Sequence, residues 1–355
     1  ALTIFFLYLT IVFLAKRLVP KGEDGLRSTA GAITIFASGL VGSLAYCFSD
    51  TFWFSAVEGE VYGMASLFTA MVFWAMTRWY ECADEPHSSK WIVLISLLMG
   101  LSIGVHLLNL LTIPCLVFMF YYRRREDGNY TALDYLKIFL ISVVILALIL
   151  FFVIPYLPKI AAYFDLFFVN VLHLPYNTGA AVFMAVLLYL LFRGILTTYD
   201  KGKVFWNTAL LCLTTIVIGF SIFTICIIRS SVKTPTNEYQ PDNPFTLVRY
   251  LGREQYGSNP LVYGQYFDAP YTLETNTYWA PLGGKYVKVK GPGKVVYKSS
   301  GKMLFPRMWD SSNPRSVDFY EIYTGGKGQK VAGADHRKPT FGANMLYFLD
   351  YQLNW

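Results

Sequence analysis

The feature that most constrains this chain is a succession of long apolar segments separated by short loops rich in Lys and Arg. An α-helix needs roughly 20 apolar residues to cross the hydrocarbon core of a bilayer. Because a bilayer offers no water to backbone polar groups, such segments must be helical. The sequence therefore predicts a polytopic α-helical membrane domain over residues 1–229. Its expected membrane segments are 1–15, 29–48, 62–79, the two halves of 91–122, 135–155, 178–197 and 204–228.

Composition agrees with that class of protein. Apolar residues make up 55% of the chain and charged residues only 15%, against roughly 25% in soluble domains. The formal charge of +7 comes from basic loops beside apolar segments, so we expect membrane lipids as a partner and no nucleic acid. The 5 cysteines include no CxxC pair, so we expect neither a disulfide framework nor a zinc site.

The apolar segment 91–122 is too long for one ordinary span. Gly100 and Gly104 favour a break near His106, which gives two short crossings. Two crossings also place the basic run Arg123–Arg125 on the same side as the other basic loops. The segments that then share the opposite, outer face are 49–61, 106–109, 155–177 and everything after residue 230.

Two prolines are expected to stop the membrane segment that begins at residue 135. Pro155 and Pro158 each remove a helical hydrogen bond. The amphipathic residues 155–177 that follow fit either a helix in the plane of the interface or a plain connecting loop.

A cluster of carboxylates lies between two apolar segments, at an expected membrane boundary. A carboxylate there is costly unless it is solvated, paired or used, so Asp50, Glu58 and Glu60 are candidates for a functional site. In an extended loop Glu58, Glu60 and Tyr62 would face one side, whereas in a helix they would diverge. The plain alternatives are a polar loop with interfacial aromatic residues, or a glutamate that caps the helix beginning near residue 62.

His106 and Asn109 are three residues apart, so on a helix they would share a face on the side of the acidic cluster. A histidine in such an apolar segment serves as often in a structural hydrogen bond as in a site. Arg229 is expected either to contact an anionic lipid phosphate or to be solvated. The carboxylates lack a metal-ligand spacing, so the sequence decides neither for nor against a divalent metal, and no cofactor is assigned.

The character of the chain changes after residue 230, where Gly, Pro, Asn and Tyr become frequent. Residues 230–355 are expected to form a small extracytoplasmic α+β region that continues beyond the fragment. Its expected elements are an amphipathic helix over 246–255, with Asn243, which can serve as its N-cap, and Pro244 just before it, and a β-hairpin of 286–290 and 294–298 around Gly291–Gly293. The chain opens without Met, inside an apolar helix, so we expect a piece of a longer protein with its first helix truncated.

Two stretches carry a resemblance to a known family. Phe52–Tyr62 and Gly100–Leu107 resemble the core signature of the bacterial DUF2723 membrane proteins, which are similar to the animal transmembrane protein 260 O-mannosyltransferases. Later stretches resemble the long form typical of Bacteroidetes, namely 237–238, 253–257, 304–309 and 339–342. The resemblance implies a GT-C-like helix bundle that acts on the outer face of the bacterial inner membrane. It would move a sugar from a polyprenyl-phosphate donor to a Ser or Thr of an exported protein.

The resemblance also implies roles for individual residues. The family's main catalytic Asp precedes a His-Pro-Pro-Gly-like pattern that this sequence lacks, so we expect it outside the fragment. Glu60, Tyr62, His106 and Asn109 carry over as supporting groups. Together with the residue patterns this predicts catalytic roles for Glu60 and His106. The residues expected to bind substrate are Glu58, Tyr62, Asn109, Asp50 and Arg229.

Two functions of other classes also fit the sequence. A transporter or flippase for a lipid-linked glycan would use a broken segment such as 91–122 and polar groups within the membrane, although no inverted repeat is evident. A non-catalytic subunit of an envelope assembly complex would use the region after residue 230 for docking. Sugar transfer by the full-length protein separates the transferase from both.

Overall fold

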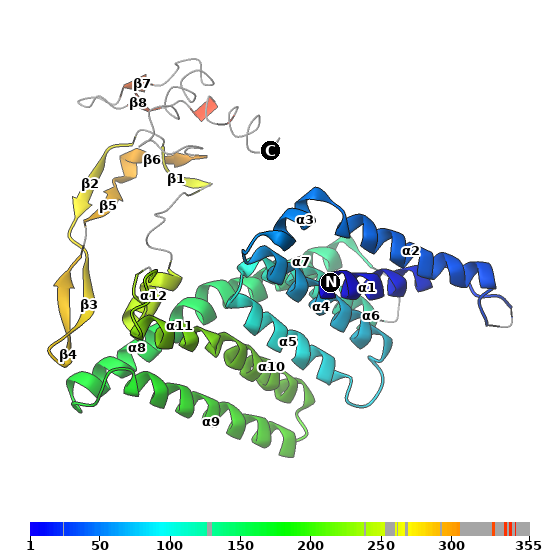
Figure 1. The fold of residues 1–355 in the computed structure, drawn as a ribbon, viewed down its shortest axis with the longest axis horizontal. Helices are drawn as coiled ribbons and strands as arrows, with labels where there is room; N and C mark the ends of the chain where they lie inside the picture. Colours follow the sequence, from blue (N-terminus) through cyan, green and yellow to red (C-terminus); the bar gives the residue numbers. More distant parts are fainter. Residues whose placement is uncertain are drawn as a thin grey trace. The chain divides into compact units, whose positions relative to one another are not determined.

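The computed structural model describes residues 1–23, 25–125, 130–237, 239–252, 260, 262–266, 269–291, 293–305, 329–330, 337–338, 341–342 and 345. The chain divides into two compact units, Ala1–Leu251 and Gly252–Trp355, and each is described by itself. The first unit is helical and the second carries the strands (Figure 1). The expected membrane domain of 1–229 lies within the first unit, and its exact border stays a prediction.

Helices of the first unit follow the apolar segments of the sequence. Its first half contains α1 (Leu2–Leu18), α2 (Thr29–Cys47), α3 (Asp50–Val57), α4 (Tyr62–Glu81), α5 (Ser89–Ile103), the 3₁₀-helix η1 (Leu107–Thr112) and α6 (Ile113–Arg124). The second half contains α7 (Ala132–Leu148), the π-helical turn η2 (Ile149–Val153), α8 (Ile154–Asn170), α9 (Thr178–Asp200), α10 (Val204–Phe220), the 3₁₀-turn η3 (Ser221–Phe223), α11 (Thr224–Ser231) and α12 (Pro244–Leu251).

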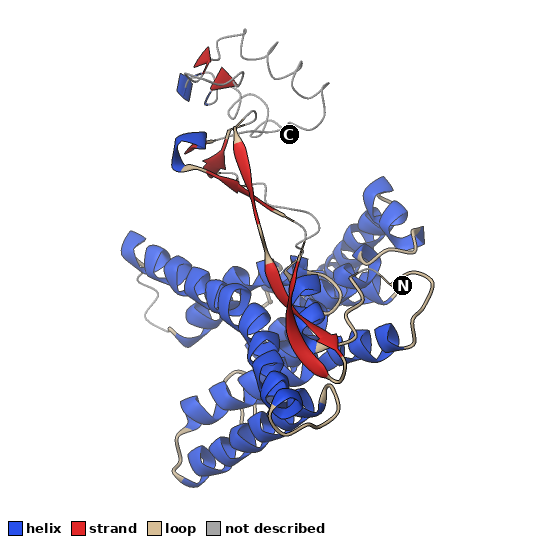
Figure 2. Ribbon diagram, turned by 90° about the vertical axis from the view of Figure 1, so that its left-hand side faces the viewer, coloured by secondary structure: helices blue, strands red, loops and turns tan. Residues whose placement is uncertain are grey.

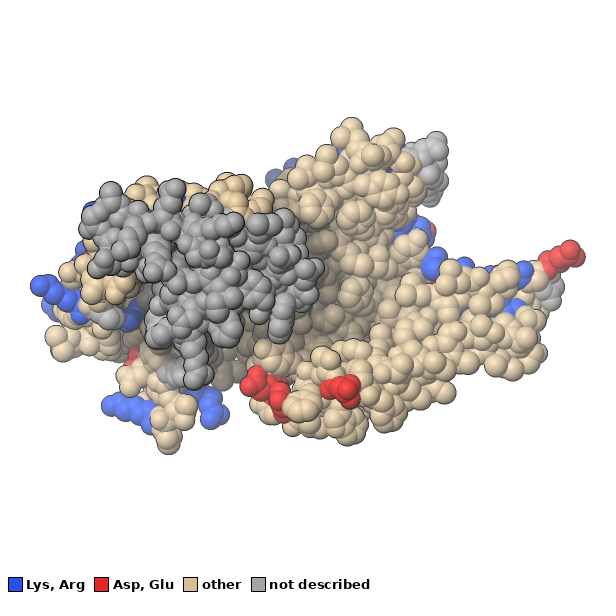
Figure 3. Space-filling model, turned by 90° about the horizontal axis from the view of Figure 1, so that it is seen from above, with Lys and Arg blue, Asp and Glu red and all other residues tan. Residues whose placement is uncertain are grey.

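Four of the described helical stretches are long and apolar enough to cross a membrane. They are Thr29–Cys47, Ala132–Asn170, Thr178–Asp200 and Val204–Ser231. Large apolar side chains are exposed along these and neighbouring helices, among them Phe36, Leu140, Phe151, Leu190 and Ile228. On the face drawn in Figure 3, most of the described residues are neither acidic nor basic. These observations confirm a polytopic helical membrane protein followed by a small strand region. The number and direction of the crossings stay predictions.

The core of the helical unit lies between α4, α5, η1 and α6. Trp79, Met76 and Leu110 are fully buried there, and Phe220 joins them from the end of α10. Because these side chains come from helices on both sides of the break after α5, the core holds the break in place.

Helices α5 and α10 approach to backbone contact through glycines. A methyl group at Gly100 would lie 2.6 Å from the carbonyl oxygen of Ile216, and one at Gly219 would lie 2.5 Å from the nitrogen of Leu101. Small residues permit such close packing where lipid gives no hydrophobic drive for helix association. The break after α5 also lies beside the η3 turn after α10. A methyl at Gly104, just past α5, would overlap Ile222 in η3.

The expected stop at Pro155 and Pro158 is wrong. Helix α7 continues through η2 into α8, so Ala132–Asn170 form one helix of 39 residues. At 1.5 Å per residue it is about 58 Å long, roughly twice the hydrocarbon core of a bilayer. The π-helical turn η2 shifts the hydrogen-bond pattern just before Pro155, where the proline N–H is missing. Residues 155–170 are therefore helical rather than a loop, and an orientation of this helix in the plane of the interface stays a prediction.

Asn243 caps α12 as the sequence predicts. The backbone N–H groups of Phe245 and Thr246 donate to Asn243 Oδ1 at 3.0 and 3.1 Å. The helix ends at Leu251, and the last expected positions, from residue 253 onward, lie outside the described residues.

The strands of the second unit pair two by two (Figure 2). They are β1 (Tyr263–Gln265), β2 (Tyr271–Glu274), β3 (Thr277–Leu282), β4 (Lys285–Lys290), β5 (Lys294–Tyr297), β6 (Lys302–Leu304), β7 (Gln329–Lys330) and β8 (Arg337–Lys338), with the 3₁₀-turn η5 (Ser299–Gly301) before β6. The antiparallel pairs are β1–β6, β2–β5, β3–β4 and β7–β8.

The expected hairpin around Gly291 is wrong, because β4 pairs with β3 and β5 pairs with β2. The chain reverses at Gly283 and Gly284, whose φ angles of +59° and +79° suit a two-residue hairpin turn. Gly291 instead directly follows β4. Its N–H donates to the carbonyl oxygen of Asn276, the residue before β3, at 2.7 Å.

Candidate functional site

The acidic segment between α2 and α4 is mostly helical. Helix α3 begins at Asp50, and Ser49 Oγ accepts a hydrogen bond from the N–H of Phe52 at 3.4 Å. The Asp50 carboxylate thus lies in a first helical turn, where the helix dipole favours negative charge. Helix α3 ends at Val57, with Glu58 as its C-cap residue, and α4 begins at Tyr62 with no capping side chain. The alternative in which a glutamate caps α4 is therefore wrong.

Glu58 and Glu60 lie in the tight connection between α3 and α4, and both are exposed. Within the described parts of the chain neither carboxylate has a hydrogen bond or an ion pair. No group of three or more His, Cys, Asp and Glu side chains that would suit a metal occurs among the described residues. The two glutamates are thus open to solvent or to a substrate.

Tyr62 and His106 are brought together by the fold. Their ring centroids are 5.5 Å apart, with the planes tilted by 52°. Tyr62 is the first residue of α4 and 44% exposed, while His106 is half-buried in the break between α5 and η1. The acidic connection and the broken segment, which the sequence predicts on the same face of the membrane, therefore meet at one place.

The backbone of the α5 break fixes the His106 ring. The N–H of His106 donates to the carbonyl oxygen of Ser102 at 2.7 Å, and the N–H of Leu108 donates to His106 Nδ1 at 3.0 Å. In a neutral imidazole whose Nδ1 accepts a hydrogen bond, the proton lies on Nε2. The ring therefore offers an Nε2–H donor that no hydrogen bond to the described residues occupies.

Asn109 does not share a helix face with His106. His106 has an extended backbone, with φ −161° and ψ 139°, and the Asn109 side chain is wholly buried. Asn109 Nδ2 donates to Ser102 Oγ at 3.0 Å, and Asn109 Oδ1 is buried with no hydrogen-bond partner among the described residues. Ser102 thus joins the two residues, since its carbonyl oxygen holds His106 and its hydroxyl holds Asn109.

Arg229 stands apart from these residues. It is exposed in the last turn of α11, and no described contact joins it to Tyr62 or His106. Asp50 likewise has no described contact with either ring. The fold therefore unites Tyr62 with His106 and leaves the roles of Arg229 and Asp50 as predictions.

Sequence reasoning missed a buried carboxylate in α8. Asp165 is wholly buried, and its oxygens accept hydrogen bonds from the N–H groups of Asn177, Gly179 and Ala180 at 3.0, 2.8 and 3.4 Å. It therefore caps the start of α9 from a neighbouring helix. A methyl at Gly179 would lie 2.5 Å from the Cα of Asp165, so the contact requires glycine. The isolated acid in the apolar stretch before a Gly-containing helix start was the available signal.

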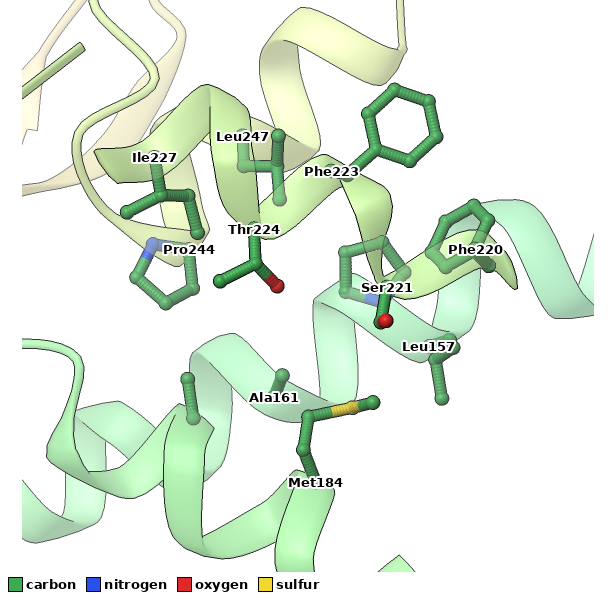
Figure 4. Close-up of a pocket in the computed structure, with 12 residues that line it drawn as sticks. Leu157, Ala161, Met184, Phe220, Ser221, Phe223, Thr224, Ile227, Pro244 and Leu247 are labelled. Carbon is green, nitrogen blue, oxygen red and sulfur yellow. The ribbon is translucent and has the colours of Figure 1, made fainter. Parts of the chain in front are cut away.

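A small apolar pocket lies between α8, α9, α12 and the η3–α11 turn (Figure 4). Its volume is about 70 Å³, well below the roughly 300–1,000 Å³ of ligand pockets. Its polar groups are the hydroxyls of Ser221 and Thr224, and Ser221 already donates to the carbonyl oxygen of Ile218 at 2.6 Å. The pocket is too small for a sugar and does not include the Tyr62–His106 contact.

Two family models match parts of the chain. Residues 1–129 match the protein O-mannosyl-transferase TMEM260 N-terminal domain. Residues 257–349 match a family of unknown function, DUF8416. No curated protein and no solved structure matches the chain. The first helices are thus similar to a protein O-mannosyltransferase domain, and the matched range contains the Tyr62–His106 contact but not Arg229.

Proposed function

We propose that this chain is the membrane part of a glycosyltransferase that moves a sugar from a polyprenyl-phosphate donor to a Ser or Thr hydroxyl of an exported protein. The observation that carries the proposal is the match of residues 1–129 to a protein O-mannosyl-transferase domain. Within that range, the Tyr62–His106 contact joins the acidic connection to the α5 break. A polytopic helical fold agrees with a donor that dissolves only in lipid.

The proposed site lies on the outer face of a bacterial inner membrane, as the resemblance to the DUF2723 proteins implies. The two ends of α4 support this orientation. Glu58 and Glu60 precede its first residue, whereas Arg17 and Arg123 both contact Tyr80 near its last turn. Basic residues favour the cytoplasmic end of a membrane helix, so the acidic end faces outward and the region after residue 230 lies in the periplasm.

The proposed chemistry assigns complementary roles to the groups at the start of α4. Cleavage of the donor leaves a phosphate that gains negative charge, and the Nε2–H group of His106 would donate a hydrogen bond to it. Glu60 would accept a hydrogen bond from the acceptor hydroxyl and so orient it for the catalytic base. Glu58 would bind sugar hydroxyls, and the ring of Tyr62 would pack against the sugar. Asn109 would hold the His106 turn through Ser102.

The remaining predicted residues have supporting parts in this proposal. Arg229 would bind the donor phosphate, and Asp50 would border the acceptor side. The main catalytic base is proposed to be an aspartate outside this chain. Full-length protein is therefore the material for any activity test.

The test is sugar transfer by the full-length protein in nanodiscs, with polyprenyl-phosphate-linked mannose as donor and exported proteins of the same envelope as acceptors. Glu60→Gln and His106→Gln should each lower the transfer rate about a hundredfold, which corresponds to roughly 2.7 kcal/mol of barrier. The matched controls Glu85→Gln and His87→Gln change an exposed acid and an exposed histidine beyond the other end of α4, and should leave the rate unchanged.

Equal rates in the site variants and their controls would remove Glu60 and His106 from the site. No transfer from a well-folded protein with any lipid-linked sugar would reject the transferase. Isolation of the protein only within a stable envelope complex would then support the non-catalytic subunit.

A transporter for a lipid-linked glycan is the second candidate, and one observation favours it. The break after α5 and the η3 turn after α10 lie side by side, at Gly104 and Ile222. Paired interruptions of this kind line binding sites in many transporters. Movement of a labelled lipid-linked sugar between leaflets of proteoliposomes, without transfer to protein, would favour this function.

A further inference from the structure

The C-terminal ends of α1, α4 and α6 meet at one end of the helical unit. The ring of Phe13 in α1 lies 6.0 Å from that of Tyr80 in α4, and the ring of Trp79 in α4 stacks on that of Phe120 in α6 at 5.0 Å. Each of the three helices carries arginine in its last turn. A helix C-terminus favours cations, but the dipole alone does not make arginines from different helices converge on one ring.

Arg17 is held in place by rings rather than by an acid. Its guanidinium carbon lies 4.4 Å from the ring centroid of Tyr80 and 4.6 Å from that of Phe13. The side chain is exposed, and in the described part of the chain its N–H groups have no hydrogen-bond or ion-pair partner. The rings therefore hold the guanidinium group in place and leave its N–H donors available to a ligand.

Arg123 brings a second guanidinium to the same tyrosine. Its guanidinium carbon lies 5.6 Å from the Tyr80 ring centroid, its Nε donates to the Tyr80 carbonyl oxygen at 3.0 Å, and a terminal nitrogen pairs with Asp84. Two cations that share one ring repel each other. An anion held by both would remove that repulsion, and a phosphate accepts paired hydrogen bonds from guanidinium groups.

Among the described residues, only part of the positive charge at this helix end is paired with an acid. Asp84 pairs with Arg123, but Arg17 and Arg124 have no acidic partner in the described ranges. Arg124 lies over the ring of Trp79, with its guanidinium carbon 5.7 Å from the centroid. Tyrosine and tryptophan at the ends of membrane helices mark the level of the lipid headgroups, where anionic lipids attract clustered arginines.

We propose that Arg17 and Arg123, which both contact the Tyr80 ring, bind the phosphate of an anionic phospholipid. The lipid lies in the leaflet at the ends of α1, α4 and α6, and its glycerol and first acyl carbons rest on the exposed apolar surface of α1, which includes Leu14 and Leu18. This inference requires only the helical membrane fold and does not rest on the proposed transferase function.

Native mass spectrometry of the full chain in detergent tests the site. Phosphatidylglycerol and phosphatidylcholine are titrated separately, and bound lipid is counted. The intact protein should prefer phosphatidylglycerol. Arg17→Gln should weaken phosphatidylglycerol binding about fivefold, and Arg17→Lys should weaken it less because the charge remains.

Arg193→Gln is the matched control, because it removes an exposed arginine from another membrane helix without an aromatic contact among the described residues. It should bind lipid like the intact protein. Helix content of Arg17→Gln by circular dichroism should be unchanged, since Arg17 is exposed.

Three results would overturn the site. They are an unchanged preference for phosphatidylglycerol in Arg17→Gln, equal losses in Arg17→Gln and Arg193→Gln, and equal affinity of the intact protein for phosphatidylcholine. A competition experiment uses inorganic phosphate, which at millimolar concentration should not displace the lipid. Full displacement by phosphate would identify a free anion rather than a lipid as the ligand.

Discussion

The two ends of α4 place a tyrosine in opposite surroundings. At the first residue, Tyr62 contacts a histidine beside two exposed carboxylates that have no partner among the described residues. In the last turn, Tyr80 contacts two guanidinium groups, one of them paired with an acid. The difference teaches that carboxylates without a partner among the described residues suit the proposed substrate site at the acidic end. The basic end is held by rings, as suits a lasting contact with lipid.

The largest effect should come from a substitution in the glycine contact of α5 and α10, which should disturb the acidic end of α4 and leave the basic end intact. Gly219→Val places carbon against the backbone of Gly100 and Leu101, so it should push α5 away and displace the His106 turn. A misplacement of about 1 Å lowers catalysis about a hundredfold, and overpacking lowers the free energy of unfolding by about 2 kcal/mol. Sugar transfer and urea unfolding measure the two effects.

In the same variant, preference for phosphatidylglycerol should be retained, because Arg17, Tyr80 and Arg123 do not touch the glycine contact. Loss of both sugar transfer and the preference for phosphatidylglycerol in this variant would show that the two ends of α4 are not independent.

A tenfold effect is expected from the buried amide at the acidic end. Asn109→Leu removes an oxygen with no partner among the described residues, so the free energy of unfolding should stay equal or rise by up to about 1 kcal/mol. Transfer should nevertheless fall about tenfold. The variant loses the hydrogen bond to the hydroxyl of Ser102, whose carbonyl oxygen holds the backbone of His106. Unchanged transfer with raised stability would make Asn109 a packing residue only.

A smaller effect, about fivefold, concerns salt at the basic end. Contacts of exposed arginines with lipid phosphate are screened when the Debye length falls from about 10 Å at 0.1 M salt to about 3 Å at 1 M. Phosphatidylglycerol binding by the intact protein should weaken about fivefold over that range. Binding by Arg17→Gln should change less. Parallel salt curves for both proteins would contradict a direct role of Arg17.

The smallest effect should come from removing single hydroxyl groups. Tyr62→Phe and Tyr80→Phe keep the rings that contact His106 and Arg17, so transfer and lipid binding should each change less than about threefold. Tyr62→Ala should instead lower only transfer, and Tyr80→Ala only lipid binding. A strong loss of transfer in Tyr62→Phe would assign its hydroxyl to the substrate.

Much of the helical fold could be predicted because membrane helices depend on local composition. Thr29–Cys47 and Thr178–Asp200 follow their predicted segments closely, since apolar length and internal hydrogen bonding suffice to specify them. Asn243 was identified for the same reason, because an N-cap acts within three residues of its own backbone.

Where the prediction from sequence failed, the local sequence allowed two solutions. Pro155 forbids an ordinary α-helical hydrogen bond, but the π-helical turn η2 accommodates it and the helix continues. Two glycine-containing turns were available for the hairpin. The pairing of β3 with β4 placed the reversal at Gly283–Gly284 rather than at Gly291.

The sequence by itself determined a polytopic helical membrane protein, with acidic residues before α4 and basic residues near its end, because hydrophobic length and charge act locally. Only the tertiary structure decided which of those groups meet. The contact of Tyr62 with His106, the sharing of Tyr80 by Arg17 and Arg123, and the capping of α9 by Asp165 all join separate helices. Such contacts depend on how glycines and core side chains set the distances between helices, which no single segment encodes.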